Sequence, residues 1–263
     1  MRRNYLIDIL RSCSMLWIVC IWHLLGYSSL YSIANEGWAN MITIIALGFF
    51  YSLSGYLLAN KYGEEKASSF YKKRITRILP LSWFAILLFP NNASIVEKIY
   101  NCLGISPLLG GSLPTMWFIA VLIEFYLLFP LITSKNTKKQ LVTILVVYLL
   151  YGLINVFVNK IDNRVLMYFP CFAVGCIWGC KHISIGESWV PSNLTRKVLS
   201  FFSTSSFCAY LFHRHIMVIM EKTILPDDGM ERLVFLYVVC VPVILVSGYY
   251  IQVVYNNWII KKI

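Results

Sequence analysis

The sequence predicts an all-α fold, a polytopic bundle of about eight transmembrane helices that spans the lipid bilayer as one domain over residues 1–263. Apolar residues make up 59% of the chain and charged residues 13%, against about 45–50% and about 25% in soluble globular proteins. The mean hydropathy is +0.68. Apolar runs of membrane-spanning length recur along the chain, with basic residues between them.

Eight windows are apolar and long enough to cross about 30 Å of hydrocarbon, and each is predicted to form a helix. The first is expected to stay in the membrane, because it lacks the small-residue cleavage site of a signal peptide. The third is the shortest, because its apolar run ends at Pro90, so we expect it to be tilted or to continue into 93–110 as a re-entrant segment. The windows are 5–27, 39–60, 78–92, 115–133, 139–158, 165–183, 198–219 and 232–257.

The basic residues support this topology. If the N-terminus is cytoplasmic, the cytoplasmic connections, such as 61–77 and 184–197, hold most of the lysines and arginines, as the positive-inside rule requires. An even number of helices then places both termini in the cytoplasm. The excess of 23 Lys and Arg over 12 Asp and Glu is thereby explained by topology, and no nucleic-acid partner is expected.

No metal site is expected. The closest cysteines, Cys171, Cys176 and Cys180, lack the CxxC spacing of metal and redox sites. His213 and His215 are two residues apart and so face apart on a helix.

The first window contains two unexpected polar residues, Arg11 and His23. An ionisable side chain in hydrocarbon costs at least about 2.5 kcal/mol on insertion scales, so it usually has a partner or a function. Arg11 is near enough to the end of the helix for its charge to reach the headgroups, which is the alternative explanation. That explanation does not extend to His23, near the other end of the span.

The segment 72–80, KKRITRILP, has two interpretations. It is either a positive-inside anchor or a site for an anion. Arg74 and Arg77 are three residues apart, so on a helical turn they share a face and can bind the phosphates of a nucleotide-like donor. Lys73 adds unspecific attraction.

Two further windows hold candidate residues. Glu124 lies in the middle of the fourth window, close to Trp117, and must be neutral, paired or in a wet cavity; Arg11 is a candidate partner by charge. A purely structural glutamate is equally consistent with the sequence. In the seventh window, the stretch containing Tyr210 and His213 can line a polar cavity.

Several segments of the chain, taken together and in order, resemble the membrane acyltransferase-3 family, which includes bacterial O-acyltransferases of surface polysaccharides. Each is weak alone, but in this order they cover most of the chain. The matching pieces are IDILR with a following His, FFYSLSGYLL (49–58), KKRITRILP (72–80), MWFIAVLIEFYLLFP (116–130), FPCFAVGCIWG (169–179) and SSFCAYLFHRHI (205–216).

The resemblance implies transfer of an acyl group, commonly acetyl from acetyl-CoA, to a hydroxyl of a glycan. Members of this family act in the bacterial inner membrane, and the acceptor would be O-antigen, capsule or a lipid-linked precursor. The roles that the resemblance and the residue patterns suggest are catalytic for Arg11, His23 and Glu124, donor-binding for Lys73, Arg74 and Arg77, and substrate-binding for Trp117, Tyr210 and His213.

The chain departs from the family in two ways. The family usually has about ten helices, and it has ten residues between the arginine and the histidine of the first helix. Here Ser12 to Trp22 makes eleven, so twelve steps of about 100° leave His23 about 120° from Arg11 on an ideal α-helix. Either a one-residue π-bulge restores the register, or the two residues serve different sites.

In the expected mechanism His23 acts as general base on the acceptor hydroxyl or accepts the acyl group transiently, and Arg11 orients it or stabilises the oxyanion. Two alternatives stay open. In a transporter, Arg11, Glu124 and His213 would bind substrate or relay protons. In a shortened, inactive relative, the bundle would serve binding or assembly.

Overall fold

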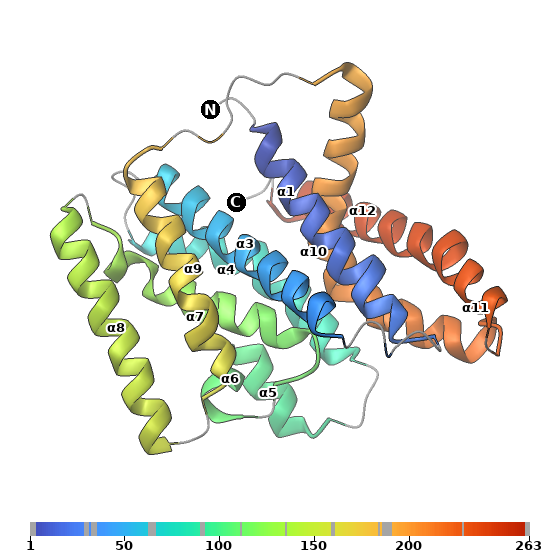
Figure 1. Ribbon diagram of the computed structural model, residues 1–263, viewed down its shortest axis with the longest axis horizontal. Helices are drawn as coiled ribbons and strands as arrows, with labels where there is room; N and C mark the ends of the chain where they lie inside the picture. Colours follow the sequence, from blue (N-terminus) through green and yellow to red (C-terminus); the bar gives the residue numbers. More distant parts are fainter. Residues whose placement is uncertain are drawn as a thin grey trace. The chain divides into compact units, whose positions relative to one another are not determined.

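The computed structural model describes residues 4–28, 32, 36–62, 67–89, 93–110, 112–134, 136–158, 161–183, 185, 191–227 and 229–260. Every regular element in these ranges is a helix (Figure 1). The all-α prediction is confirmed, and each of the predicted windows overlaps a helix. The predicted number of membrane-spanning helices stays a prediction. Among the described residues, 4 helices are long and apolar enough to cross a membrane: Tyr5–His23, Gly37–Lys61, Thr137–Phe157 and Met230–Trp258.

The chain forms two compact units, whose boundary falls within α3 (Gly37–Tyr62). That they act as the single predicted domain stays a prediction, as does the cytoplasmic placement of both termini. The first unit comprises Met1–Phe49, Leu88–Pro90 and Ser184–Ile263, and the second comprises Phe50–Leu87 and Asn91–Ile183.

In the first unit, α10 is the central helix. It covers Asn193–Thr223 and packs against α1 (Tyr5–Met15) and α12 (Val241–Trp258) (Figure 1). The other elements described there are the first part of α3, the π-helical η1 (Leu16–His23), α11 (Met230–Phe235) and the π-helical η2 (Leu236–Cys240).

Two contacts show how closely these helices pack. Ser203 in α10 donates a hydrogen bond of 2.9 Å to the carboxylate of Asp8 in α1. Gly248 lets α12 approach α10, because a Cβ at that position would lie 2.7 Å from the backbone nitrogen of Ala209. Small residues at such crossings are typical of membrane helix bundles.

In the second unit, α7 is the central helix. It covers Met116–Ile132 and is almost entirely apolar, and it packs against α4 (Ala67–Leu87), α8 (Thr137–Val158) and α9 (Asn163–Cys180). Two short helices, α5 (Ile95–Leu103) and α6 (Ser106–Leu109), precede α7 and contact it.

Helices α3 and α9 cross at backbone contact within the second unit. A Cβ added to Gly175 would lie 1.9 Å from the carbonyl oxygen of Ser52, and one added to Gly179 would lie 2.5 Å from that of Tyr56. The two glycines form a GxxxG pattern on one face of α9. Neither tolerates a side chain without movement of the helix backbones.

The region from residue 67 to 110 corrects the prediction. The segment 72–77 was expected in a loop before the third helix, but it lies inside α4, which begins eleven residues earlier than predicted and ends at Leu87. Lysine and arginine are good helix formers, and no glycine or proline interrupts residues 67–79. The predicted end of that helix, residues 90–92, lies outside the described residues. Residues 95–109 form α5 and α6.

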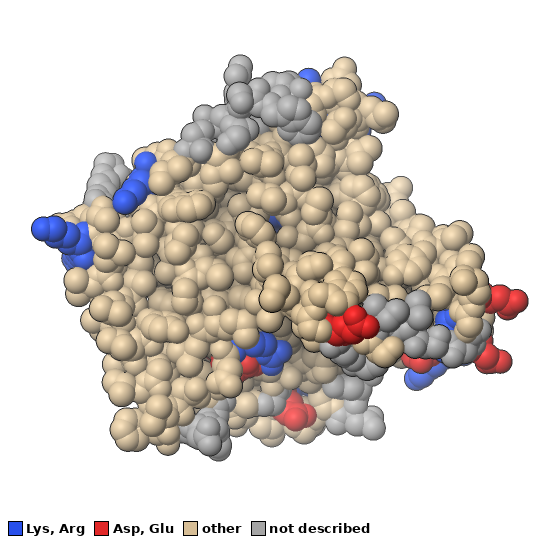
Figure 2. All heavy atoms as spheres, viewed as in Figure 1, with Lys and Arg blue, Asp and Glu red and all other residues tan. Residues whose placement is uncertain are grey.

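The outer surface is largely free of charge. Only 6% of the membrane-spanning window of α8 is buried in the protein, so apolar side chains such as Leu145, Leu149 and Phe157 point outward. On the face in Figure 2, lysine, arginine, aspartate and glutamate cover little of the surface. Such a surface is stable against lipid and not against water.

Candidate active site

The first helix becomes π-helical at Leu16 and stays so to His23. A π-turn accommodates an additional residue. The twelve steps from Arg11 to His23 therefore count as eleven α-helical steps, which return to within about 20° of the starting face. Of the two possibilities that the sequence left open, the structure shows the π-helical one, and by this count Arg11 and His23 come to one face of the helix.

Sharing a face does not place the two residues at the same depth. Over twelve residues a helix rises by about 18 Å along its axis, which is longer than an arginine side chain. Arg11 is half-buried and has an interaction of its own. Arg11 and His23 therefore act at different depths, although both belong to the first unit.

At its own depth, His23 meets the seventh predicted helix. Its imidazole stacks on that of His213 in α10, with ring centroids 4.6 Å apart and planes 8° from parallel. The ring of Tyr210 lies 6.4 Å from that of His23. Three residues predicted for the site thus meet in the first unit, although some 190 residues separate them in sequence.

The hydrogen bonds of His213 define its tautomer. Its Nδ1 lies 2.7 Å from the backbone oxygen of Tyr210, and because a carbonyl only accepts, Nδ1 is the donor. In the neutral ring Nε2 is then an acceptor. His213 is fully buried, and this Nε2 has no hydrogen-bond partner among the described residues; the same is true of Nδ1 of His23 and Nε of Arg214.

The predicted donor-binding residues lie together on α4 in the second unit. Residues 72–77 are helical, so side chains three or four residues apart lie on one face. Arg77 therefore shares a face with Arg74, three residues before it, and with Lys73, four residues before it. Lys73 and Arg77 are exposed, whereas the guanidinium of half-buried Arg74 lies 5.7 Å from the ring centre of Phe70. The face presents positive charge to solvent.

Glu124 lies in α7 of the second unit and is 5% exposed. Neither carboxyl oxygen has a hydrogen-bond partner among the described residues. The pairing with Arg11 considered from the sequence is therefore not observed. An unpaired carboxyl in such surroundings is costly to ionise, so Glu124 is expected to be neutral.

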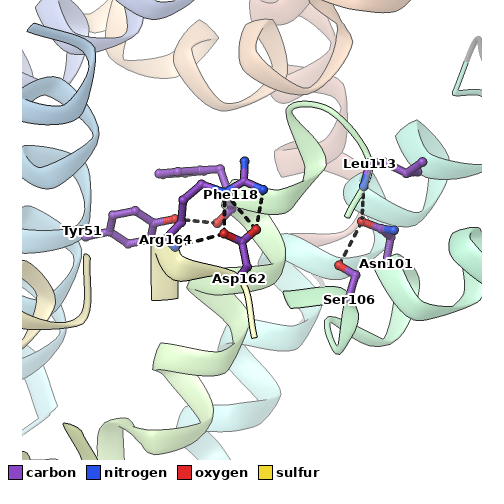
Figure 3. A network of polar contacts seen from close by, with 7 residues as sticks. All are labelled: Tyr51, Asn101, Ser106, Leu113, Phe118, Asp162 and Arg164. Atoms are coloured by element: carbon purple, nitrogen blue, oxygen red, sulfur yellow. Dashed lines mark hydrogen bonds and ion pairs between the residues drawn. The ribbon is translucent and has the colours of Figure 1, made fainter. Parts of the chain in front are cut away.

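Trp117 begins α7 and contacts a residue that sequence reasoning missed. The guanidinium of Arg164 lies 4.0 Å from the centre of the Trp117 ring, at cation–π distance. Asp162 holds that guanidinium through its two carboxylate oxygens, with Nε at 2.7 and 2.9 Å (Figure 3). The ring of Tyr168 also stacks on that of Trp117, with the centroids 6.1 Å apart.

The chain leading to Trp117 is held by Asn101 of α5. Its Oδ1 accepts hydrogen bonds from Ser106 at 3.1 Å and from the backbone of Leu113 at 3.2 Å (Figure 3). Thr115, two residues before Trp117, has a positive φ of 67°. Asparagine at a turn and an Asp-x-Arg sequence opening α9 are the signals that point to this support of Trp117 in retrospect.

No group of three or more His, Cys, Asp or Glu with the geometry of a metal site occurs in the described part of the chain. The cysteines are free thiols.

The fold and these residues define a multi-pass membrane protein with a histidine pair inside one helical unit. The family model of the acyltransferase-3 family, described as an acyltransferase domain, matches residues 4–189, and the chain therefore belongs to this family. No curated protein and no solved structure gives a significant match. The matched range includes Arg11, His23, α4 and Trp117, and it ends before α10 with Tyr210 and His213.

Proposed function

We propose that the protein transfers an acetyl group from acetyl-CoA to a hydroxyl of a bacterial surface polysaccharide, O-antigen or capsule, or of its lipid-linked precursor, in the inner membrane. The observation that carries the proposal is the stacked pair of His23 and His213 at the end of the π-helical segment. It gives the histidine suggested by the family a ring to stack on, and Nδ1 of that histidine has no hydrogen-bond partner among the described residues.

In this reaction a ring nitrogen of His23 takes the proton of the acceptor hydroxyl. The oxygen attacks the carbonyl carbon of the thioester, and the carbonyl electron pair moves onto the carbonyl oxygen. When the intermediate collapses, the C–S bond breaks and the CoA sulfur takes the proton from His23. The products are the O-acetylated glycan and CoA-SH.

The donor part of the proposal rests on α4 in the second unit. Its face of Lys73, Arg74 and Arg77 has the charge and helical spacing to bind CoA phosphates, and arginine binds phosphate oxygens in a planar fork. Trp117, whose ring contacts Arg164 and Tyr168, is a further candidate for binding substrate.

The donor assignment is tested with two thioesters. In Arg74→Ala/Arg77→Ala, we expect KM for acetyl-CoA to rise at least about tenfold, because each charged hydrogen bond contributes about 1.5–3 kcal/mol. KM for S-acetyl-pantetheine, which lacks the nucleotide phosphates, should not change. The assay is radiolabelled acetyl transfer to the host polysaccharide after mild base has removed its own acetyl groups.

The matched control is Lys138→Ala/Lys139→Ala, which removes two exposed cations at the start of α8. It should leave both KM values unchanged. An equal rise of KM for the two thioesters in the α4 variant would contradict a phosphate site on α4.

A further inference from the structure

Arg214 has no assigned role, although it follows His213 directly in α10. Its Nε is buried, and no hydrogen bond or ion pair of its side chain is found within the described residues. The acid further along the same helix, Glu221, lies 4.0 Å from a different arginine, Arg232. A guanidinium inside an apolar bundle is costly without a partner or a function.

The surroundings of Arg214 are those of the histidine pair. Arg214 directly follows His213 in α10, and the His213 ring stacks on that of His23 at the end of η1. Arg11 lies about 18 Å from His23 along the helix axis. Arg214 therefore carries a positive charge near the depth of the histidine pair.

We infer that Arg214 stabilises the oxyanion of the acyl-transfer intermediate, the role that the sequence suggested for Arg11. This inference rests on the proposed function. When the acceptor oxygen bonds to the thioester carbon, the carbonyl oxygen gains the electron pair and a negative charge. The Nε–H of Arg214 has no protein acceptor, so it is free to donate to that oxygen. When the C–S bond breaks, the electron pair re-forms the C=O bond, and the negative charge passes to the CoA sulfur, which takes the proton from His23.

The test compares Arg214→Gln and Arg214→Lys with the wild type in proteoliposomes, using acetyl-CoA and the de-O-acetylated host polysaccharide. Loss of an oxyanion donor costs about 10²- to 10³-fold in kcat. We expect Arg214→Gln to lose that much kcat with KM for both substrates nearly unchanged. Arg214→Lys, which keeps the charge but not the fork, should fall between Gln and wild type.

Chemical rescue and a control separate this role from a structural one. Added ethylguanidine should restore part of the kcat of Arg214→Ala, since it replaces the missing donor. Arg196→Gln, at the exposed start of the same helix, should keep wild-type kcat. Wild-type kcat in Arg214→Gln, or a loss only in KM, would overturn the inference while leaving the proposed function intact. A wild type without any acetyl transfer would overturn both.

Discussion

The contact between His23 and His213 gives the site its orientation. Many catalytic histidines are held by a carboxylate at the second ring nitrogen. Here the parallel planes, 8° apart, bring ring face to ring face, so neither imidazole hydrogen-bonds to the other. His213 is itself fixed by its bond to the Tyr210 carbonyl. We regard His213 as a positioning residue that acts through the face of its ring.

This predicts different outcomes for two substitutions of His213. His213→Phe keeps a flat ring against His23 and should retain most of the kcat. His213→Ala removes the ring, and because an aromatic pair contributes about 0.5–1.5 kcal/mol, kcat should fall up to about tenfold. Both variants are assayed by acetyl transfer, with the melting temperature measured in parallel because Ala also leaves a cavity. Equal losses of kcat in His213→Phe and His213→Ala would show that Nε2 of His213, and not the face of its ring, is what the site needs.

At the residue scale, the sequence predicted the members of the site better than their contacts. Arg11 and His23 stand out because polar residues are rare in apolar windows, and His213 for the same reason. Their grouping depends on which helices are neighbours, which periodicity does not show. Arg164 did not stand out in the sequence, because its cation–π contact with Trp117 joins helices far apart in the chain.

Among the elements, the π-helical η1 has the most specific consequence for the site, because it sets the direction in which His23 points. It absorbs the additional residue between Arg11 and His23. Deleting Ile21, whose side chain is 37% exposed, should convert the segment to an α-helix with His23 on the same face, and acetyl transfer should persist. Inserting one alanine after Ile21 should turn His23 by about 100° and abolish transfer. Activity in the insertion variant, or its loss in the deletion variant, would contradict this account of the bulge.

The crossing of α3 and α9 supplies a stability prediction. In Gly175→Ala the new Cβ meets the Ser52 backbone at 1.9 Å, so the helices must separate. Overpacking of this kind costs about 1–3 kcal/mol, and the melting temperature should fall. In Gly152→Ala, on α8, the Cβ meets nothing within 4 Å. That change should stabilise the helix by about 0.5–1 kcal/mol. Similar shifts in the two variants would contradict the close crossing.

For the whole molecule, hydropathy was sufficient to predict the helical class and the long helices, because each must cover its polar backbone in lipid. It was not sufficient between residues 67 and 110. In that region the basic first part of α4 and the short helices α5 and α6 have too few apolar residues to be recognised by hydropathy. The predicted third helix was therefore too short at its N-terminal end. The division into two units depends on long-range packing that no single window shows.

The central claim is that this membrane protein transfers an acyl group with His23 as its base. The most direct measurement follows labelled acetyl from acetyl-CoA to de-O-acetylated host polysaccharide in proteoliposomes of the wild type, His23→Gln and His182→Gln. His182 is an exposed histidine of the second unit that bonds to Asn60 at 2.8 Å, and it is the matched control. The account predicts transfer by the wild type and His182→Gln and none above background by equally stable His23→Gln. Undiminished transfer by His23→Gln would contradict it.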